Sequence, residues 1–318
     1  VFFSQIYMKN KKIIVQISEG LGNQLFMYAH GFSLSKKICY DLEIDNISGY
    51  KRKKNLLRQH QKYFLDYFSL NVPIIKNDFL INSEFYNIKK KILLFFDYFK
   101  KKKSFYIETK LRVGCKKEVN YIDFFNSKHL SNKVYVLGNF ENQNYFKQYR
   151  SELIKNLTIK NEYLNFKNPL IKELMNSNSV SIHIRRNKFS DQKKIKNTNL
   201  INKSLNFTND TINYINNGID YFNKKISNPK YFIWTNDVNG IQEFTDKLNT
   251  SNFLLITNNN VINDFYLFSF SKHFIVGPST FHWWGAWLNQ NKNKICLRPS
   301  TINPSNNPCF WPNEWISI

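Results

Sequence analysis

Between residues 170 and 290 the sequence alternates short apolar runs with longer segments whose apolar residues recur every three or four positions. The runs lie at 180–186, 231–235, 253–257 and 274–276, and the helical segments at 170–178, 211–225 and 264–271. Strands that alternate with helices predict a parallel sheet, because each crossover helix returns the chain to the same edge of the sheet. The C-terminal half is therefore predicted to be an α/β domain.

The strand expected at 180–186 ends in two adjacent arginines, Arg185 and Arg186. Open α/β sheets bind ligands outside the carboxyl ends of their strands, and a guanidinium group can hold two phosphate oxygens at once. His183 and Arg185 share one face of the strand, while Arg186 points to the other face. The pattern favours Arg185 as a ligand of a phosphate or diphosphate. Solvated arginines at an exposed strand end remain the alternative.

A second anion-binding pattern follows the strand at 274–276. A Gly277-Pro278 turn precedes a helix that would have Ser279 or Thr280 at its N-cap. The start of a helix presents unpaired backbone N–H groups and the positive end of the helix dipole. Two such patterns on successive strand-helix units predict one bound diphosphate.

The N-terminus has a similar strand, turn and helix at 13–17, 20–24 and 25–35. Gly20 and Gly22 are expected to allow positive φ and a close approach of the backbone to a ligand. The third glycine of the dinucleotide-binding fingerprint is missing, so a nicotinamide or flavin cofactor is not indicated.

Five segments in order resemble glycosyltransferase family 11, the α-1,2-fucosyltransferases. They are Gly20-Leu-Gly-Asn-Gln24, 137–146, His183-Ile-Arg-Arg186, 232–237 and Ser279-Thr-Phe-His-Trp-Trp-Gly-Ala286. The chain departs from the family pattern at Lys188, where the family has an aspartate, at Asn236, which replaces the first residue of an Asp-Asp pair, and at Pro278 and His282.

The resemblance implies an α/β, GT-B-like fold of two Rossmann-like domains with a cleft between them. Residues 8–165 would be the acceptor-side domain and 166–318 the nucleotide-sugar-binding domain. From composition, the polar stretch that includes 160–162 and 165–169 is the expected linker. The implied enzyme is an inverting galactoside α-1,2-fucosyltransferase. It would move L-fucose from GDP-fucose to the 2-hydroxyl of a terminal galactose-type residue of a surface polysaccharide or lipid-linked oligosaccharide. Lys188 and Pro278 leave open another donor sugar or linkage.

Roles for single residues follow from the resemblance and from position. The catalytic candidates are Arg185 and Asp191; the donor-binding candidates are His183, Arg185, Arg186, Asp237, Asp264, Ser279 and Thr280; the acceptor or sugar candidates are Gly20, Gly22, Asn23 and Gln24. Lys188 is a poor base while it is protonated, so Asp191 or Glu19 would have to accept the acceptor's proton. Asp264 could instead cap a helix, and His183 could instead be a core histidine.

No Asp-x-Asp motif follows a strand, so transfer without a metal ion is expected, and no cofactor besides the donor is implied. The four cysteines are far apart, which indicates neither a zinc site nor a disulfide scaffold. A reducing, cytoplasmic location is expected, and residues 1–7 are interpreted as a leader from an alternative start.

The tryptophans at 283, 284 and 287 are expected in the core. The polar stretch 187–210 is expected to be a loop that closes over a ligand.

The net charge of +23 suits a nucleic-acid binder, a membrane-surface enzyme or a lysine-rich proteome. Aromatic residues do not alternate with the basic runs as a base-stacking surface requires, so a polyanion-binding or RNA-binding protein is only a distant alternative. Residues 89–103 place an apolar segment between two lysine clusters. This segment is too short to span a bilayer. It could contact an anionic membrane at the inner face, but the favoured hypothesis buries its apolar side in the N-terminal core.

Overall fold

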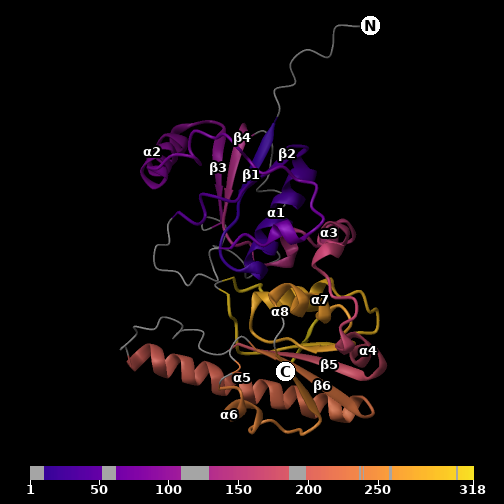
Figure 1. The fold of residues 1–318 in the computed structure, drawn as a ribbon. Helices are drawn as coiled ribbons and strands as arrows, with labels where there is room; N and C mark the ends of the chain where they lie inside the picture. The colour runs from indigo at the N-terminus through magenta and orange to yellow at the C-terminus, as the bar shows by residue number, and fades with distance from the viewer. Residues whose placement is uncertain are drawn as a thin grey trace. The chain divides into compact units, whose positions relative to one another are not determined.

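A computed structural model describes residues 11–51, 62–108, 129–185, 198–235, 238, 240–257, 260–305 and 307–318. The chain divides into two compact units (Figure 1). The N-terminal unit comprises Val1–Thr158 and Asn307–Phe310, and the C-terminal unit comprises Ile159–Asn306 and Trp311–Ile318. The division falls before the polar stretch that was expected to be the linker. That Asn307–Phe310 belongs to the N-terminal unit was not predicted.

The N-terminal unit is built on a parallel sheet with the strand order β2-β1-β4-β3. The central strand β1 is apolar on both faces, with Ile13, Ile14 and Val15 all buried, as expected for a strand covered on both sides. Its strands are β1 (Lys12–Gln16), β2 (Asp41–Asp45), β3 (Lys103–Ile107) and β4 (Leu130–Leu137), and its helices are α1 (Leu21–Ile38), α2 (Tyr86–Phe99) and α3 (Arg150–Asn156).

The C-terminal unit contains a parallel sheet with the strand order β10-β9-β8-β5-β6-β7. The strands are β5 (Asn178–Ile184), β6 (Pro229–Thr235), β7 (Phe253–Ile256), β8 (His273–Ile275), β9 (Cys296–Arg298) and β10 (Ile316–Ser317). The helices are α4 (Pro169–Asn176), α5 (Thr198–Lys225), α6 (Gln242–Thr245), α7 (Val261–Phe268) and α8 (Thr280–Leu288). The predicted α/β class with parallel sheets is confirmed.

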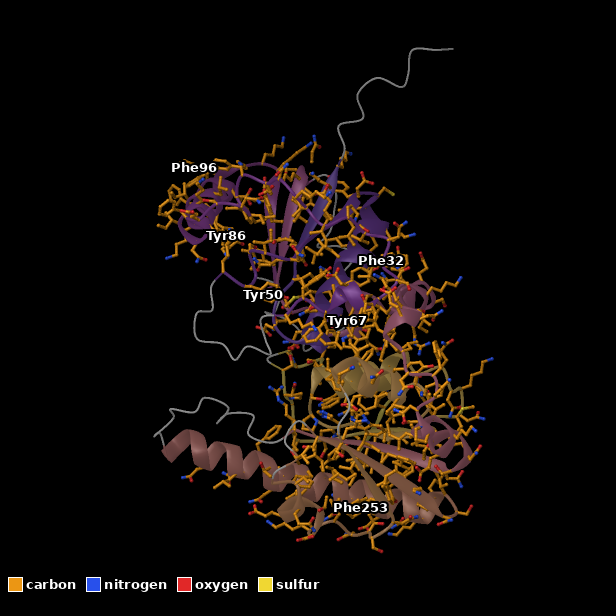
Figure 2. The ribbon with its side chains drawn as sticks, in the orientation of Figure 1. Phe32, Tyr50, Tyr67, Tyr86, Phe96 and Phe253 are labelled. Atoms are coloured by element: carbon orange, nitrogen blue, oxygen red, sulfur yellow. The ribbon has the colours of Figure 1, made fainter. Side chains whose placement is uncertain are left out.

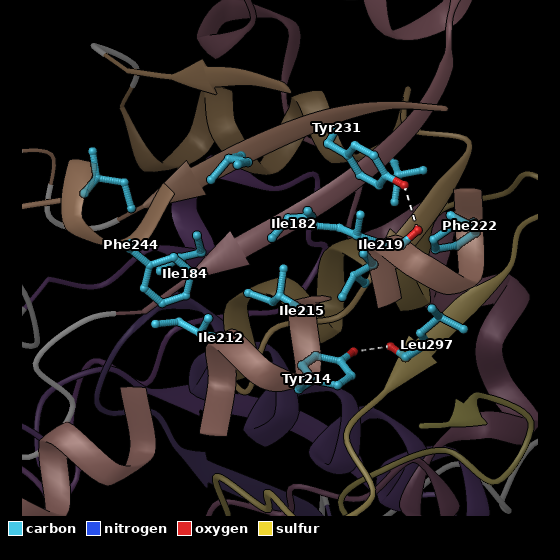
Figure 3. Close-up of a cluster of buried hydrophobic side chains, with 14 residues drawn as sticks. Ile182, Ile184, Ile212, Tyr214, Ile215, Ile219, Phe222, Tyr231, Phe244 and Leu297 are labelled. Carbon is cyan, nitrogen blue, oxygen red and sulfur yellow. Dashed lines mark hydrogen bonds between the residues drawn. The ribbon is translucent and has the colours of Figure 1, made fainter. Parts of the chain in front are cut away.

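Helices cover both faces of the C-terminal sheet (Figure 1). On one face, Ile182 and Ile184 of β5 pack with Ile215 and Ile219 of α5 in a buried cluster (Figure 3). The hydroxyl of Tyr214 on α5 donates to the carbonyl of Leu297 on β9 at 2.8 Å, which satisfies this buried polar group. These contacts place α5 under the middle of the sheet.

On the opposite face lie α7 and α8. Trp234 of β6 packs edge-on against Phe268 of α7, with ring centroids 4.9 Å apart. The tryptophans of α8, at positions 283, 284 and 287, are buried as predicted. They belong to the core and do not form a platform for a sugar.

Two predictions about helices were wrong. Helix α5 begins at Thr198, so 198–210 is not a loop. Its first turns are rich in asparagine, a residue of low helix propensity because its side chain competes for backbone hydrogen bonds, so the sequence did not indicate a helix here. The rest of the expected loop, 187–197, lies outside the described residues.

The apolar side of α2 is exposed and does not enter the core, because the buried residues of this helix are Tyr86 and Asp97. No helix in the described ranges is both long and apolar enough to cross a membrane.

Candidate anion site at the carboxyl ends of β5 and β8

The order of the C-terminal sheet reverses between β5 and β8. After β5, the chain adds β6 and β7 on one side, and it then crosses to build β8, β9 and β10 on the other side. Ligands of open α/β sheets bind at such a reversal, because the loops that leave the two strands run in opposite directions and open a crevice. The residues that follow β5 and β8 therefore form the candidate site.

Gly277 allows the ends of these two strands to come close together. The parallel register pairs Ile182 with Ile275, two residues before Gly277. A Cβ atom on Gly277 would lie 2.0 Å from the carbonyl oxygen of His183, a distance no side chain tolerates. The glycine thus lets the turn before α8 pass directly over the end of β5.

The face of β5 that points toward α8 is polar. Ser181 and His183 alternate with the isoleucines that face α5. Ser181 Oγ lies 2.9 Å from Nε2 of His282, and the Gly277 N–H donates to Nδ1 of the same ring at 2.9 Å. Because Nδ1 accepts a hydrogen bond, the neutral His282 ring carries its proton on Nε2 and donates it to Ser181. His282 therefore fixes the turn before α8 to the strand β5.

Ser279 is the N-cap of α8, as predicted. Its Oγ accepts the His282 N–H at 3.2 Å and lies 3.3 Å from Nδ1 of His183. Within the described ranges, no acceptor bonds the backbone N–H groups of Thr280 or Phe281. These two donors and the helix dipole make the start of α8 a potential anion site.

Arg185 follows β5 directly and is half-buried. No hydrogen bond or ion pair joins its guanidinium group to another residue in the described part of the chain. An unpaired arginine next to a helix N-terminus at a sheet reversal concentrates positive charge where a ligand can enter. The two anion-binding patterns expected from the sequence therefore lie on neighbouring strands of one sheet.

The buried histidines of the site are neutral. Burial lowers the pKa of His183 to about 3, and the positive charge of Arg185 adds to the effect. Burial also lowers the pKa of His282 well below its usual value, with a contribution from His183. Neutral rings add no charge of their own, so among the described residues that follow β5 and β8 the positive charge is that of Arg185.

The other donor-side candidates are only partly placed. Asp264 lies in the first turn of α7, but it does not cap the helix, because Asn260 accepts the N–H groups of Ile262 and Asn263. Its role as a ligand of the nucleoside stays a prediction. The remaining candidates lie outside the described residues: Arg186, Asp191, Asp237 and the Lys188 and Asn236 departures.

The N-terminal sheet reverses its strand order between β1 and β4. Gly20, Gly22 and the adjacent amides follow β1, and the family-like segment 137–146 begins at the end of β4. The positive φ that was expected at these glycines occurs at a different residue. Gly20 has a φ of −82°, Gly22 is inside α1, and the left-handed residue is Glu19, with a φ of 68°.

The amides beside this turn differ in role. Asn23 donates through Nδ2 to the Glu19 carboxylate. Gln24 is fully buried, and its amide donates to the carbonyls of Glu19 and Lys62, both at 2.8 Å, while its oxygen accepts the Phe64 N–H at 2.8 Å. Both amide hydrogens of Gln24 are used, so this side chain holds the turn together and has no donor left for a sugar. Gly20, Gly22 and Asn23 remain candidates for the acceptor side.

No group of three or more His, Cys, Asp or Glu side chains among the described residues is arranged to hold a metal ion.

The structural roles of His282 and Gly277 at the site were not predicted from the sequence. The departure from the family pattern at His282 was a signal, but its meaning depends on the pairing of β5 with β8, which the sequence does not show.

Comparisons with known proteins agree with the resemblance. The sequence profile of glycosyl transferase family 11 matches residues 12–316. An alpha-1,2-colitosyltransferase of Escherichia coli is 26% identical over 315 residues, covering 96% of this chain and 98% of the relative. The O-antigen biosynthesis glycosyltransferase WbnK of Escherichia coli is 24% identical over 325 residues, covering 95% and 99%.

Among solved structures, the fucosyltransferase NodZ from Bradyrhizobium aligns with a TM-score of 0.47 at 13% identity, over 87% of this chain and 92% of that one. This likeness is too low to bear on the activity. The match of the family profile to nearly the whole sequence is decisive, and the chain belongs to glycosyltransferase family 11.

Proposed function

We propose that this glycosyltransferase moves L-fucose from GDP-fucose to the 2-hydroxyl of a terminal galactose-type residue, with inversion and without a metal ion. The observation that carries the proposal is that Arg185 follows β5 at the sheet reversal, while the adjacent strand β8 leads into α8, whose Thr280 and Phe281 N–H groups have no acceptor in the described ranges. Family membership supplies the reaction class.

The proposed chemistry follows from the leaving group. As the glycosidic bond breaks, negative charge grows on the diphosphate, so donors placed on it stabilise the transition state more than the ground state. Arg185 would supply a bidentate, charge-assisted contact, and the start of α8 would supply neutral N–H donors. Such a pair performs the task that a divalent cation performs in metal-dependent transferases.

A second donor sugar enters the proposal because one relative is named a colitosyltransferase. Colitose is L-fucose without its 3-hydroxyl group, so a site for either sugar needs the same diphosphate contacts. Discrimination would depend on a partner for that one hydroxyl. A site that bonds the hydroxyl rejects the deoxy sugar strongly, whereas an apolar site rejects the hydroxyl only weakly.

The acceptor side would use the loops after β1 and β4, where Gly20, Gly22 and Asn23 lie. A glycan that forms part of a surface polysaccharide or a lipid-linked oligosaccharide is the proposed acceptor, in line with the relative named for O-antigen biosynthesis. Its 2-hydroxyl must lose a proton. Asp191 and Glu19 are the proposed bases, and variants that replace each with its amide would identify the one that acts.

A thermal-shift screen of nucleotide sugars tests the donor directly. Only a ligand that binds the folded chain raises its melting temperature, by an amount set by its concentration and affinity. We expect GDP, GDP-fucose and GDP-colitose to raise it, and UDP-glucose and UDP-galactose to leave it unchanged. Transfer rates with the two GDP-sugars then decide the donor. A shift with the UDP-sugars alone would overturn the proposal.

A further inference from the structure

Helix α2 is fixed to the N-terminal sheet by one face. Tyr86, which is labelled in Figure 2, is buried. Its hydroxyl accepts a hydrogen bond from the side-chain amide of Gln16 in β1 at 2.9 Å. Asp97, near the C-terminal end of α2, is also buried, and its Oδ1 accepts a hydrogen bond from the Ser104 N–H of β3 at 2.7 Å. Lys103 donates to the carbonyls of Asp97 and Tyr98 at the end of the helix. The rotation of α2 about its axis is therefore set by these anchors.

The opposite face of α2 is apolar and exposed. The spacing of its apolar residues, mostly three or four positions apart, places them in a single stripe along the helix. We call these residues the apolar stripe, with exposed fractions of 58% for Ile88, 50% for Ile92, 63% for Phe95, 57% for Phe96 and 70% for Phe99. The rings of Phe95 and Phe99 lie 5.3 Å apart, so the stripe is continuous. Two further exposed rings precede the stripe, Phe79 at 76% and Phe85 at 65%.

Lysines border this stripe. At 100° per residue, Lys89 and Lys91 project to its two sides. Lys100, Lys101 and Lys102 follow the helix and are exposed. Asp97 is the acidic residue within α2, and it is buried on the anchored face. The exposed side of α2 therefore combines an apolar strip with a positive border.

We propose that α2 docks the N-terminal unit on an anionic lipid surface, with the helix lying in the plane of the membrane. At 14 residues the helix is too short to cross a bilayer, which takes about 20. Phenylalanine and isoleucine side chains would enter the boundary between headgroups and acyl chains, while the lysines extend toward anionic headgroups. A second copy of the chain fits this face less well, because a symmetric contact through the stripe would bring the lysine borders together.

Vesicle co-sedimentation tests the proposal with phosphatidylcholine vesicles that either lack or contain phosphatidylserine. We expect the protein to bind the anionic vesicles much more strongly than the neutral ones, and to bind them more weakly as salt rises. The variant Phe95→Gln/Phe99→Gln should reduce the partition coefficient about tenfold or more, because two large apolar groups are removed from the contact. The matched control is Phe166→Gln/Leu205→Gln, which replaces two apolar residues of similar exposure in the C-terminal unit and should bind as the wild type does.

A second pair of variants tests the charged border. Lys89→Gln/Lys91→Gln should weaken binding to anionic vesicles about tenfold, whereas Lys224→Gln/Lys225→Gln, with the same change in net charge on exposed residues of α5, should not. Circular dichroism checks that each variant remains folded. Equal binding by the α2 variants and their controls would overturn the proposal. A dimer that forms without lipid and is lost in Phe95→Gln/Phe99→Gln would also overturn it and assign the stripe to a second copy.

Discussion

Both sheets reverse their strand order, but the side chains at the two reversals differ in kind. After β5 lies Arg185, and after β8 lie the backbone N–H groups of Thr280 and Phe281, all without a hydrogen-bond partner among the described residues. After β1 lie a carboxylate and an amide that bond each other, Glu19 and Asn23. Topology gives both units a place for a ligand, and the charge of the described side chains, positive at Arg185 and negative at Glu19, favours an anion at the C-terminal place.

The largest effect should come from Arg185→Ala. We expect kcat/KM for transfer to fall about a thousandfold, roughly 4 kcal/mol of transition-state stabilisation, because the variant loses the charged contact to the leaving group. Arg185→Lys should also be poor, since an ammonium group cannot form the bidentate contact. The melting temperature, measured as a control, should not change, because Arg185 holds no structural partner in the described ranges. A variant with a third of the wild-type activity would remove Arg185 from the mechanism.

The next largest effect is on stability. Gly277→Ala should destabilise the C-terminal unit by about 3 kcal/mol, because the new methyl group cannot coexist with the His183 carbonyl and the strand ends must separate. Urea unfolding followed by tryptophan fluorescence reports on this unit, since the tryptophans at 234, 283, 284, 287, 311 and 315 all belong to it. A change below about 1 kcal/mol would show that the strand ends can separate easily.

Gln24→Ala tests whether Gln24, at the N-terminal reversal, stabilises the fold or binds the acceptor sugar. The variant leaves the buried N–H of Phe64 without its acceptor, so we expect a loss of about 2 kcal/mol in stability. Donor binding should be unaffected. Unchanged stability combined with a raised KM for the acceptor would instead make Gln24 a sugar ligand.

The pH dependence of stability should also differ between the units. A buried histidine with a lowered pKa binds its proton in the unfolded chain but not in the folded one, so stability falls as pH drops from about 6.5 toward the folded pKa. The C-terminal unit contains His183, with a folded pKa of about 3, and His282, whereas His30, with a folded pKa of about 3, lies in the N-terminal unit.

Urea unfolding of the wild type and His282→Gln at several pH values measures the contribution of His282 to the pH dependence of the C-terminal unit. Glutamine keeps an acceptor and a donor but does not titrate. Below pH 6 the variant should lose less stability per pH unit than the wild type, by about 1.4 kcal/mol for the one missing proton. Identical slopes would mean that His282 is not neutral and buried in the folded chain.

The smallest expected effect is that of a chelator. Activity should persist in excess EDTA, because Arg185 and the start of α8 would take the place of a cation at the diphosphate. The assay compares rates before and after chelation. A loss of activity that manganese restores would contradict metal-independent transfer.

The sequence predicted best what depends on neighbours along the chain. The strand before the arginines and the cap at Ser279 follow from local signals. The cap lies where the sequence placed it, and β5 ends at Ile184, two residues before the predicted end. The functions of Gly277 and His282 depend on which strands pair, and no local signal reports that. The orientation of α2 was wrong for a related reason, because an amphipathic pattern does not tell whether the apolar side meets the core or another surface.

The central claim is that the C-terminal reversal, and not the N-terminal one, binds the diphosphate of the donor. Titration calorimetry with GDP tests it most directly, using wild type, Arg185→Ala and Glu19→Gln. The account predicts that Arg185→Ala weakens GDP binding at least about tenfold and that Glu19→Gln leaves it unchanged. GDP binding that is unaffected by Arg185→Ala but altered by Glu19→Gln would contradict it.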